Sequence, residues 1–184
     1  LEMSPAITCN KRCRHCWRDT SVFSKGWVGP VDEPAEIVQN CIKARAKLLN
    51  GFRGSKIVGQ DVVDAALAPN NVAISLTGEP MMYPRYSELV KEFFRAGFET
   101  VFAVTSGTVP ETIKKLDVWP TNVYLSVEAW CEELFLKCCI PVVSNAWDLF
   151  LESAELLSSA PTRTVMRITC MKGINMDCPE KFAF

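Results

Sequence analysis

The stretch Cys9-Asn10-Lys11-Arg12-Cys13-Arg14-His15-Cys16 sets three cysteines at the spacing C-x3-C-x2-C. Three thiolates this close together can hold three irons of a cubane iron–sulfur cluster, because cysteine sulfur is the usual ligand of iron in such clusters. The next cysteine is Cys41, so no fourth thiolate follows at short spacing. The fourth iron would therefore stay open to a small molecule, as a catalytic metal keeps one position open.

A structural zinc ion is the alternative occupant, with His15 or a distant cysteine as its fourth ligand. The sequence lacks the paired C-x2-C halves that are typical of structural zinc sites. Incidental thiols without a metal are a third possibility. The spacing favours the cluster over both alternatives.

The composition is that of one ordinary globular domain. The chain has 184 residues, of which 48% are hydrophobic and 22% are charged, which is enough for a sizeable core. No apolar run approaches the ~20 residues that span a bilayer, so we expect no membrane partner. Nine cysteines, an odd number in no regular framework, indicate a reducing compartment and a cytoplasmic location. The first residues do not resemble a signal peptide.

The net charge of −1 gives no overall signal for nucleic acid. A local signal exists around the cysteines, where Lys11, Arg12, Arg14 and Arg18 crowd one short stretch. These side chains form either a solvated loop or a basic rim that meets phosphate.

Strands and helices alternate along the chain, which predicts a parallel sheet with right-handed crossovers. The expected strands cover residues 5–8, 72–76, 100–104, 123–127 and 164–169, and the expected helices cover residues 34–48, 62–67, 86–94, 110–116 and 145–157. Residues 130–143 have mixed character. Polar candidate residues follow the carboxyl ends of the strands, where α/β barrels carry their active sites.

The cysteine motif after a first strand resembles the signature of the radical S-adenosylmethionine (SAM) enzymes. Cys16-Trp17-Arg18 and Thr77-Gly78-Glu79-Pro80-Met81-Met82-Tyr83-Pro84 resemble the wyosine branch, the tRNA 4-demethylwyosine synthases, and the stretch RITCMKGIN at 167–175 adds to the match. The resemblance runs from about Ser4 to the C-terminus. It implies an α/β fold, an open (β/α)6 radical SAM barrel with parallel strands, of which about five strand–helix units are present.

Residues 1–184 are thus expected to form a single radical SAM core domain. A sixth strand is expected soon after residue 184, so we interpret the sequence as truncated at both ends. The second cluster of this branch, and the lysine that forms a Schiff base with pyruvate, lie upstream of the SAM loop in the family, and only eight residues precede Cys9. No lysine in this sequence is assigned that role.

The resemblance also implies a ligand set. Cys9, Cys13 and Cys16 would hold a [4Fe–4S] cluster. Gly78, Glu79 and Pro80 would receive the amino group of SAM, although such a stretch also forms plain turns. His15 stands where the family places an aromatic against the adenine, and a solvent-exposed histidine is the alternative. Trp17 would shield the cluster or pack in the core.

The later strand ends complete this set. Ser106, Ser126 and Glu128 would meet the SAM carboxylate and ribose hydroxyls, as an acidic residue does in dinucleotide sites. Arg167 would pair with a carboxylate or phosphate, or with an acid inside the barrel, and Lys172 and Asn175 follow it in the family pattern. The remaining cysteines are interpreted as ordinary reduced thiols: Cys41, Cys131, Cys138, Cys139, Cys170 and Cys178.

In the resembled family the reduced cluster cleaves SAM to a 5′-deoxyadenosyl radical. The radical abstracts hydrogen from the N1-methyl group of guanosine 37 in phenylalanine tRNA, and the methyl carbon condenses with two carbons of pyruvate. The implied partners are the tRNA anticodon loop, pyruvate and an electron donor such as a flavodoxin or ferredoxin. The alternatives are another radical SAM enzyme, such as a glycyl-radical activase, or an iron–sulfur or zinc module without turnover.

Overall fold

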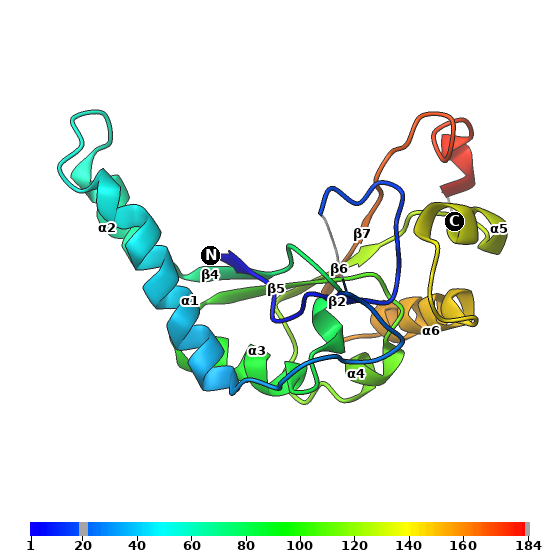
Figure 1. The fold of residues 1–184 in the computed structure, drawn as a ribbon, viewed down its shortest axis with the longest axis horizontal. Coiled ribbons are helices and arrows are strands. Elements are labelled where there is room, and N and C mark those ends of the chain that lie inside the picture. The colour runs from blue at the N-terminus through cyan, green and yellow to red at the C-terminus, as the bar shows by residue number, and fades with distance from the viewer. Residues whose placement is uncertain (19–21, 183–184) are drawn as a thin grey trace.

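The computed structural model describes residues 1–18 and 22–182. Five parallel strands form one sheet whose spatial order follows the chain. These strands are β1 (Glu2–Met3), β4 (Asn71–Ile74), β5 (Thr100–Thr105), β6 (Asn122–Ser126) and β7 (Arg163–Arg167). In the described part of the chain β1 and β7 are the edges of the sheet, which does not close into a barrel. The expected α/β fold with parallel strands is confirmed, and the sheet is open (Figure 1).

Helices connect consecutive strands of the sheet. They are α1 (Pro34–Leu49), α2 (Gln60–Leu67), α3 (Tyr86–Arg95), α4 (Pro110–Lys114), α5 (Glu132–Cys139) and α6 (Ala146–Ser158), with short 3-10 turns at η1 (Asn50–Phe52), η2 (Pro80–Met82) and η3 (Pro179–Phe182). Helices α3, α4 and α6 lie together on one side of the sheet (Figure 1). Helix α1 packs against α3, and α4 packs against α6. No helix of the described residues is both long and apolar enough to cross a membrane.

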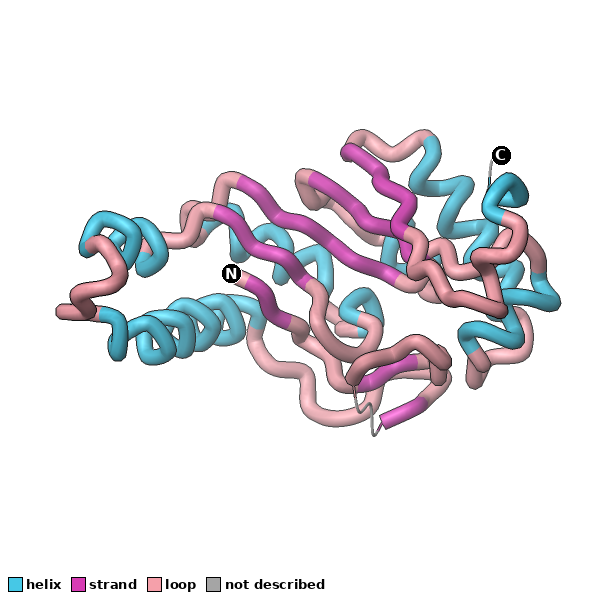
Figure 2. Tube along the Cα trace, turned by 90° about the horizontal axis from the view of Figure 1, so that it is seen from above, coloured by secondary structure: helices cyan, strands magenta, loops and turns pink. Residues whose placement is uncertain are grey.

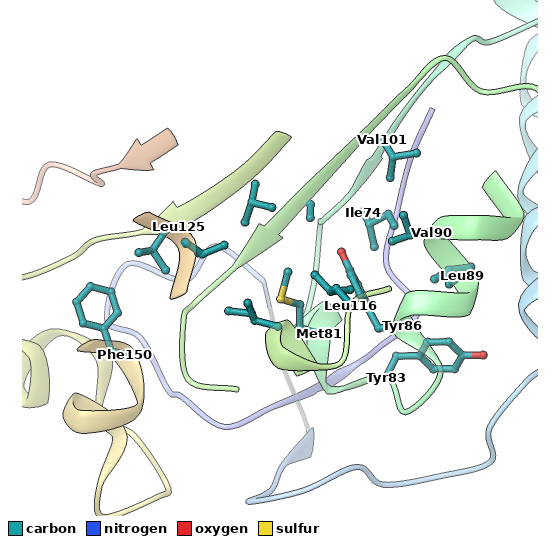
Figure 3. Close-up of a cluster of buried hydrophobic side chains, with 14 of the residues drawn as sticks. Ile74, Met81, Tyr83, Tyr86, Leu89, Val90, Val101, Leu116, Leu125 and Phe150 are labelled. Carbon is teal, nitrogen blue, oxygen red and sulfur yellow. The ribbon is translucent and has the colours of Figure 1, made fainter. Parts of the chain in front are cut away.

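The core lies between the sheet and these helices. Every second residue of a strand points to the same face, and Ile74, Val101 and Leu125 are among the buried residues on the helix-covered face. Leu89 and Val90 of α3 meet them from the helical side (Figure 3). Full burial of such side chains contributes about 1.5–3 kcal/mol each, so this face holds the sheet in place.

The opposite face of the sheet has few helices above it (Figure 2). The register places Val104 opposite Tyr124, and Ser126 opposite Arg167, on neighbouring strands. Glu2 of β1 shares this face because it lies opposite Ala73. The open face therefore collects the polar residues at the carboxyl ends of the strands.

One expectation about local structure is wrong, and one helix was not predicted. The first strand of the sheet is Glu2–Met3, whereas Thr8–Cys9 forms β2 and pairs with β3 (Val22–Phe23) in a separate two-stranded sheet. A two-residue strand has too little periodicity to be detected. The mixed stretch after residue 130 contains α5, which ends at Ile140 with a positive φ of 43°.

Candidate active site

A pocket of about 950 Å³ opens on the face of the sheet that the helices leave free. Most of the residues expected to bind cofactors line it: Cys9, Cys13, His15, Cys16, Trp17, Gly78, Glu79, Pro80, Ser106, Ser126, Glu128 and Arg167. They come from the cysteine loop and from the carboxyl ends of four strands of the main sheet, β4 to β7. The sheet thus brings together side chains that are up to 158 residues apart, from Cys9 to Arg167.

The cysteine loop is held by the end of α5. The last carbonyls of a helix have no partner within the helix, and here they accept hydrogen bonds from the loop. The amide of Arg12 donates to the Cys139 carbonyl at 2.9 Å, and the amide of Arg14 donates to the Cys138 carbonyl at 2.9 Å. Lys11 forms an antiparallel bridge with Pro141 beside them. These contacts therefore hold the backbone of the loop against the end of α5.

Gly78 lies where the end of β4 approaches the chain before Cys9. Its φ is 66°, and a Cβ atom there would come within 2.6 Å of the carbonyl oxygens of Ala6 and Thr8. Only glycine fits both the backbone conformation and this close approach. The next amide, that of Glu79, donates to the Thr8 carbonyl at 2.8 Å, so this turn fixes the start of the cysteine loop.

The carboxylate of Glu79 is buried and used within the protein. It accepts hydrogen bonds from the Met81 amide at 3.1 Å, the Thr105 hydroxyl at 2.9 Å and the Ser106 amide at 2.6 Å. The side chain is 1% exposed. Glu79 therefore joins the turn after β4 to the end of β5, and the pocket wall depends on it.

His15 and Glu128 meet across the pocket. Nε2 of His15 lies 3.4 Å from Oε1 of Glu128. The Glu128 carboxylate also accepts from the Thr169 amide at 3.2 Å and the Thr169 hydroxyl at 3.3 Å. Since Nδ1 of His15 is buried without a hydrogen-bond partner among the described residues, the imidazole has one nitrogen left for a ligand.

Ser126 and Arg167 form a second polar pair on the open face. They are register partners on β6 and β7, and a guanidinium nitrogen of Arg167 donates to the Ser126 hydroxyl at 3.0 Å. In the described residues Arg167 has no carboxylate partner within 4 Å. Its charge therefore remains available to an anionic ligand in the pocket.

The structure does not bring Lys172 and Asn175 to the pocket wall. Lys172 is exposed, whereas Asn175 is 2% exposed. The Asn175 amide donates to the carbonyls of Glu128 and Thr169 at 3.0 and 2.9 Å. Asn175 thus holds the loop after β7 in place behind the wall.

The sequence reasoning missed several residues that line the pocket, among them Glu2, Phe23, Leu76, Thr169 and Cys170. The period-2 pattern of the strands would indicate Glu2 once β1 is known. Leu76 has a positive φ of 92°, which is rare outside glycine. Nothing in the sequence marks that conformation.

Two arginine–aromatic pairs stand at the mouth of the pocket. The guanidinium carbon of Arg18 lies 3.8 Å from the centroid of the Trp17 ring, and that of Arg12 lies 4.9 Å from the Phe23 ring. Trp17 is 77% exposed, which excludes the alternative that it packs in the core. We call these four residues the arginine–aromatic rim.

The three thiols of the motif lie in different environments. Burial raises the pKa of Cys9 to about 11. A hydrogen bond to the thiol of Cys139, together with burial, raises the pKa of Cys13, and the same bond lowers the pKa of Cys139. Cys16 is exposed. Without a metal, the motif therefore contains two thiols that are held in their neutral form.

The donor set fits a cluster better than a single zinc ion. Among the described residues, no three side chains of His, Cys, Asp or Glu converge closely enough to hold one ion. Tetrahedral zinc, with bonds of about 2.3 Å, needs its sulfurs only ~3.8 Å apart. A cubane cluster binds each thiolate through a different iron and so accepts a wider spacing. All nine cysteines are free thiols, which leaves the motif available for iron.

Comparison with known proteins identifies the family of this chain. The family model described as the radical SAM superfamily matches residues 3–184. This match covers nearly all of the sequence, including the cysteine loop and the strands β4 to β7. The chain therefore belongs to the radical SAM superfamily.

The similar proteins are wyosine synthases. The S-adenosyl-L-methionine-dependent tRNA 4-demethylwyosine synthase of Pyrococcus horikoshii is 42% identical, over 100% of this chain and 55% of that protein. The enzyme of that name from Saccharomyces cerevisiae is 31% identical over 100% of this chain and 23% of its own length. The resemblance seen in the sequence is confirmed. The chain spans about half the length of the archaeal relative.

A solved structure agrees at the level of the fold. The structure described as TYW1 with a lysine-pyruvate adduct bound has a TM-score of 0.83 and 31% identity to this chain. The match covers 97% of this chain and 57% of that one.

Proposed function

We propose that this chain carries the radical SAM chemistry of a tRNA 4-demethylwyosine synthase. The reaction would form 4-demethylwyosine from N1-methylguanosine 37 of phenylalanine tRNA and pyruvate. The observation that supports this most is the position of Cys9, Cys13 and Cys16 at one pocket with the strand-end polar residues. The similarity to wyosine synthases gives the substrate class.

In this proposal Cys9, Cys13 and Cys16 hold a [4Fe–4S] cluster. When bound, the cluster supplies the electron for reductive cleavage of SAM, while the protein orients the cofactor and excludes water. The raised pKa values of Cys9 and Cys13 mean that binding iron must displace their protons. Loading should therefore release protons and become tighter as the pH rises.

The pocket wall offers a partner for each part of SAM. Arg167 would bind the methionine carboxylate, with Ser126 beside it. Glu128 would bind ribose hydroxyls, and the His15 ring would stack on or hydrogen-bond to the adenine. Since three hydrogen bonds from the protein already engage the Glu79 carboxylate, we assign recognition of the SAM amino group to the backbone of residues 78–80.

Lys172 and Asn175 take supporting parts in this proposal. Asn175 would keep Glu128 in position through the bond to its carbonyl. Lys172, exposed on the loop after β7, would meet the phosphates of the tRNA.

The arginine–aromatic rim is our candidate for contact with the anticodon loop. A base that is modified must be taken out of its stack, and proteins receive unstacked RNA bases on aromatic rings and guanidinium planes. Trp17 and Arg18 offer both at the mouth of the pocket. The exposed part of the cysteine loop would also face the electron donor, a flavodoxin or ferredoxin in the reducing cytoplasm.

Pyruvate is proposed as the second substrate from the same similarity. The related structure is described with a lysine-pyruvate adduct. None of the lysines here is assigned to such an adduct, and pyruvate would approach from the open mouth of the pocket.

The decisive experiment is anaerobic reconstitution with iron and sulfide, followed by measurement of 5′-deoxyadenosine from SAM and dithionite. We expect the wild type to hold four irons of one cluster and to cleave SAM. The triple variant Cys9→Ala, Cys13→Ala, Cys16→Ala should do neither. As a matched control, the triple variant Cys41→Ala, Cys131→Ala, Cys178→Ala should retain both properties. Equal iron and SAM cleavage in the two triple variants would contradict the proposal.

Product analysis tests the substrate. The reconstituted protein is incubated with SAM, dithionite, pyruvate and tRNA that contains N1-methylguanosine, and the digested nucleosides are analysed by mass spectrometry. Cleavage of SAM with loss of hydrogen from the N1-methyl group supports a wyosine synthase. Cleavage of SAM that leaves the methyl group intact would point to another radical SAM reaction.

A further inference from the structure

Lys11 is a charged residue buried inside the cysteine loop. Its side chain is 4% exposed, although it lies between Cys9 and Cys13 on a loop whose neighbours Arg12 and Arg14 are exposed. The bridge to Pro141 fixes the backbone at this position, so the side chain is directed inward. The lysine thus differs from the other basic residues of the loop.

The ammonium group of Lys11 has only weak partners. Its Nζ lies 3.4 Å from the carbonyl oxygen of Ser106 and 5.3 Å from the ring centroid of Phe135. In the described part of the chain no carboxylate lies within 4 Å of it. A buried charge without a close counter-charge costs several kcal/mol, so a negative group bound next to Lys11 would be stabilised.

The groups around Lys11 indicate where that negative charge belongs. Lys11 stands two residues from Cys9 and two residues from Cys13 in the sequence, and all three residues line the same pocket. A buried acid of this pocket wall, Glu79, lies beyond ion-pair distance of Lys11, and its carboxylate is already held by three hydrogen bonds. Two of the three cluster ligands therefore flank the buried cation, and both become thiolates when iron binds.

We propose that Lys11 is a positioning residue whose buried ammonium group is the counter-charge of the thiolate-bound cluster and raises its reduction potential. The inference rests on the proposed function, since it needs a cluster on Cys9, Cys13 and Cys16. Reduction adds an electron to an anionic group, and a fixed cation in a low-dielectric surrounding favours that addition. Net charge and hydrogen bonding are among the factors that set cluster potentials.

The test is a redox titration of the reconstituted protein, with the reduced cluster measured by electron paramagnetic resonance. The variants are Lys11→Met, which removes the charge at similar size, and Lys11→Arg, which keeps it. Arg14→Gln is the matched control, because it removes an exposed charge from the same loop. Iron content and circular dichroism are measured for each protein.

At the wild-type midpoint potential, we expect Lys11→Met to lower the ratio of reduced to oxidised cluster at least tenfold. This corresponds to a midpoint potential that is lower by about 59 mV for a one-electron reduction. Lys11→Arg and Arg14→Gln should stay within threefold of the wild type. Loss of iron from Lys11→Met alone, with the fold intact, also supports a counter-charge. An unchanged midpoint in Lys11→Met, an equal shift in Arg14→Gln, or loss of iron from Lys11→Arg as well would overturn the inference.

The two proposals fail differently. A wild-type protein that takes up no cluster contradicts the proposed function. A wild-type protein that holds a cluster and cleaves SAM, while Lys11→Met keeps its potential, contradicts only the role of Lys11.

Discussion

The Glu79 carboxylate accepts a hydrogen bond from the Ser106 amide at 2.6 Å, which ties the turn after β4 to the end of β5. Both residues were candidates for direct contact with SAM. The bond shows that Glu79 also has a structural role, because it holds the wall of the pocket together.

Replacing Glu79 should therefore destabilise the protein itself. Glu79→Ala would leave the Ser106 amide and two further donors unpaired in a buried site, at a cost of about 3 kcal/mol in the free energy of unfolding. Glu79→Gln should lose less, because its carbonyl oxygen still accepts. Urea denaturation of the cluster-free protein measures both values. A loss of SAM affinity in Glu79→Ala without any loss of stability would instead favour direct contact.

Gly78→Ala should be far more harmful than alanine at a comparable glycine. The new methyl group would meet two carbonyl oxygens at 2.6 Å, so we expect a loss of roughly 3 kcal/mol. Gly173 has a similar φ of 71° with no atom within 4 Å of a built Cβ, and Gly173→Ala should cost only about 1 kcal/mol. Equal losses in the two variants would show that the close approach contributes nothing.

Tyr86 and Tyr83 should respond in opposite ways to loss of the hydroxyl group. The Tyr86 hydroxyl is buried without a partner among the described residues, so Tyr86→Phe should stabilise by about 1 kcal/mol. The Tyr83 hydroxyl donates to the Asp32 carbonyl, so Tyr83→Phe should destabilise by a similar amount. Thermal unfolding at neutral pH distinguishes them.

Tyr86 also predicts how the stability of the protein depends on pH. Burial raises the pKa of Tyr86 above its ordinary value of 10. Its neutral form therefore belongs to the folded state, and the associated stability is complete below pH 10 and lost as the pH rises further. Tyr86→Phe should lose less stability than the wild type between pH 9 and pH 11. An equal loss of stability in the wild type and in Tyr86→Phe would show that another group causes the dependence on pH.

Part of this molecule could be predicted from its sequence. The strands predicted over residues 100–104 and 123–127 lie within one residue of β5 and β6 at either end, because short apolar runs mark them, and parallel strands bring their carboxyl ends to one edge. The internal use of Glu79 was not visible, since it depends on where β5 lies relative to β4. Helix α5 was missed because it has only eight residues, which is too short for a clear helical pattern. Tertiary packing buries its apolar residues Leu134, Phe135, Cys138 and Cys139.

The arginine–aromatic rim can be tested separately from turnover. Stacking of a base on an aromatic side chain contributes about 1–3 kcal/mol, so Trp17→Ala should weaken binding of a labelled anticodon stem–loop RNA by roughly 5- to 150-fold. Trp17→Phe should keep most of the affinity. The control Leu48→Ala removes another exposed apolar side chain, 79% exposed on α1, and should have no effect. Fluorescence anisotropy at one fixed salt concentration measures all three; wild-type affinity in Trp17→Ala would remove Trp17 from the RNA interface.

The hydrogen bonds from the amides of Arg12 and Arg14 to the end of α5 have a consequence for how the protein responds to oxygen. Oxygen would strip iron from the proposed cluster, but the hydrogen bonds that join the cysteine loop to the end of α5 are between backbone groups and use no thiol. Its amides should resist hydrogen exchange even in the stripped protein. A protein that has lost its cluster in this way would regain it from iron and sulfide without unfolding and refolding.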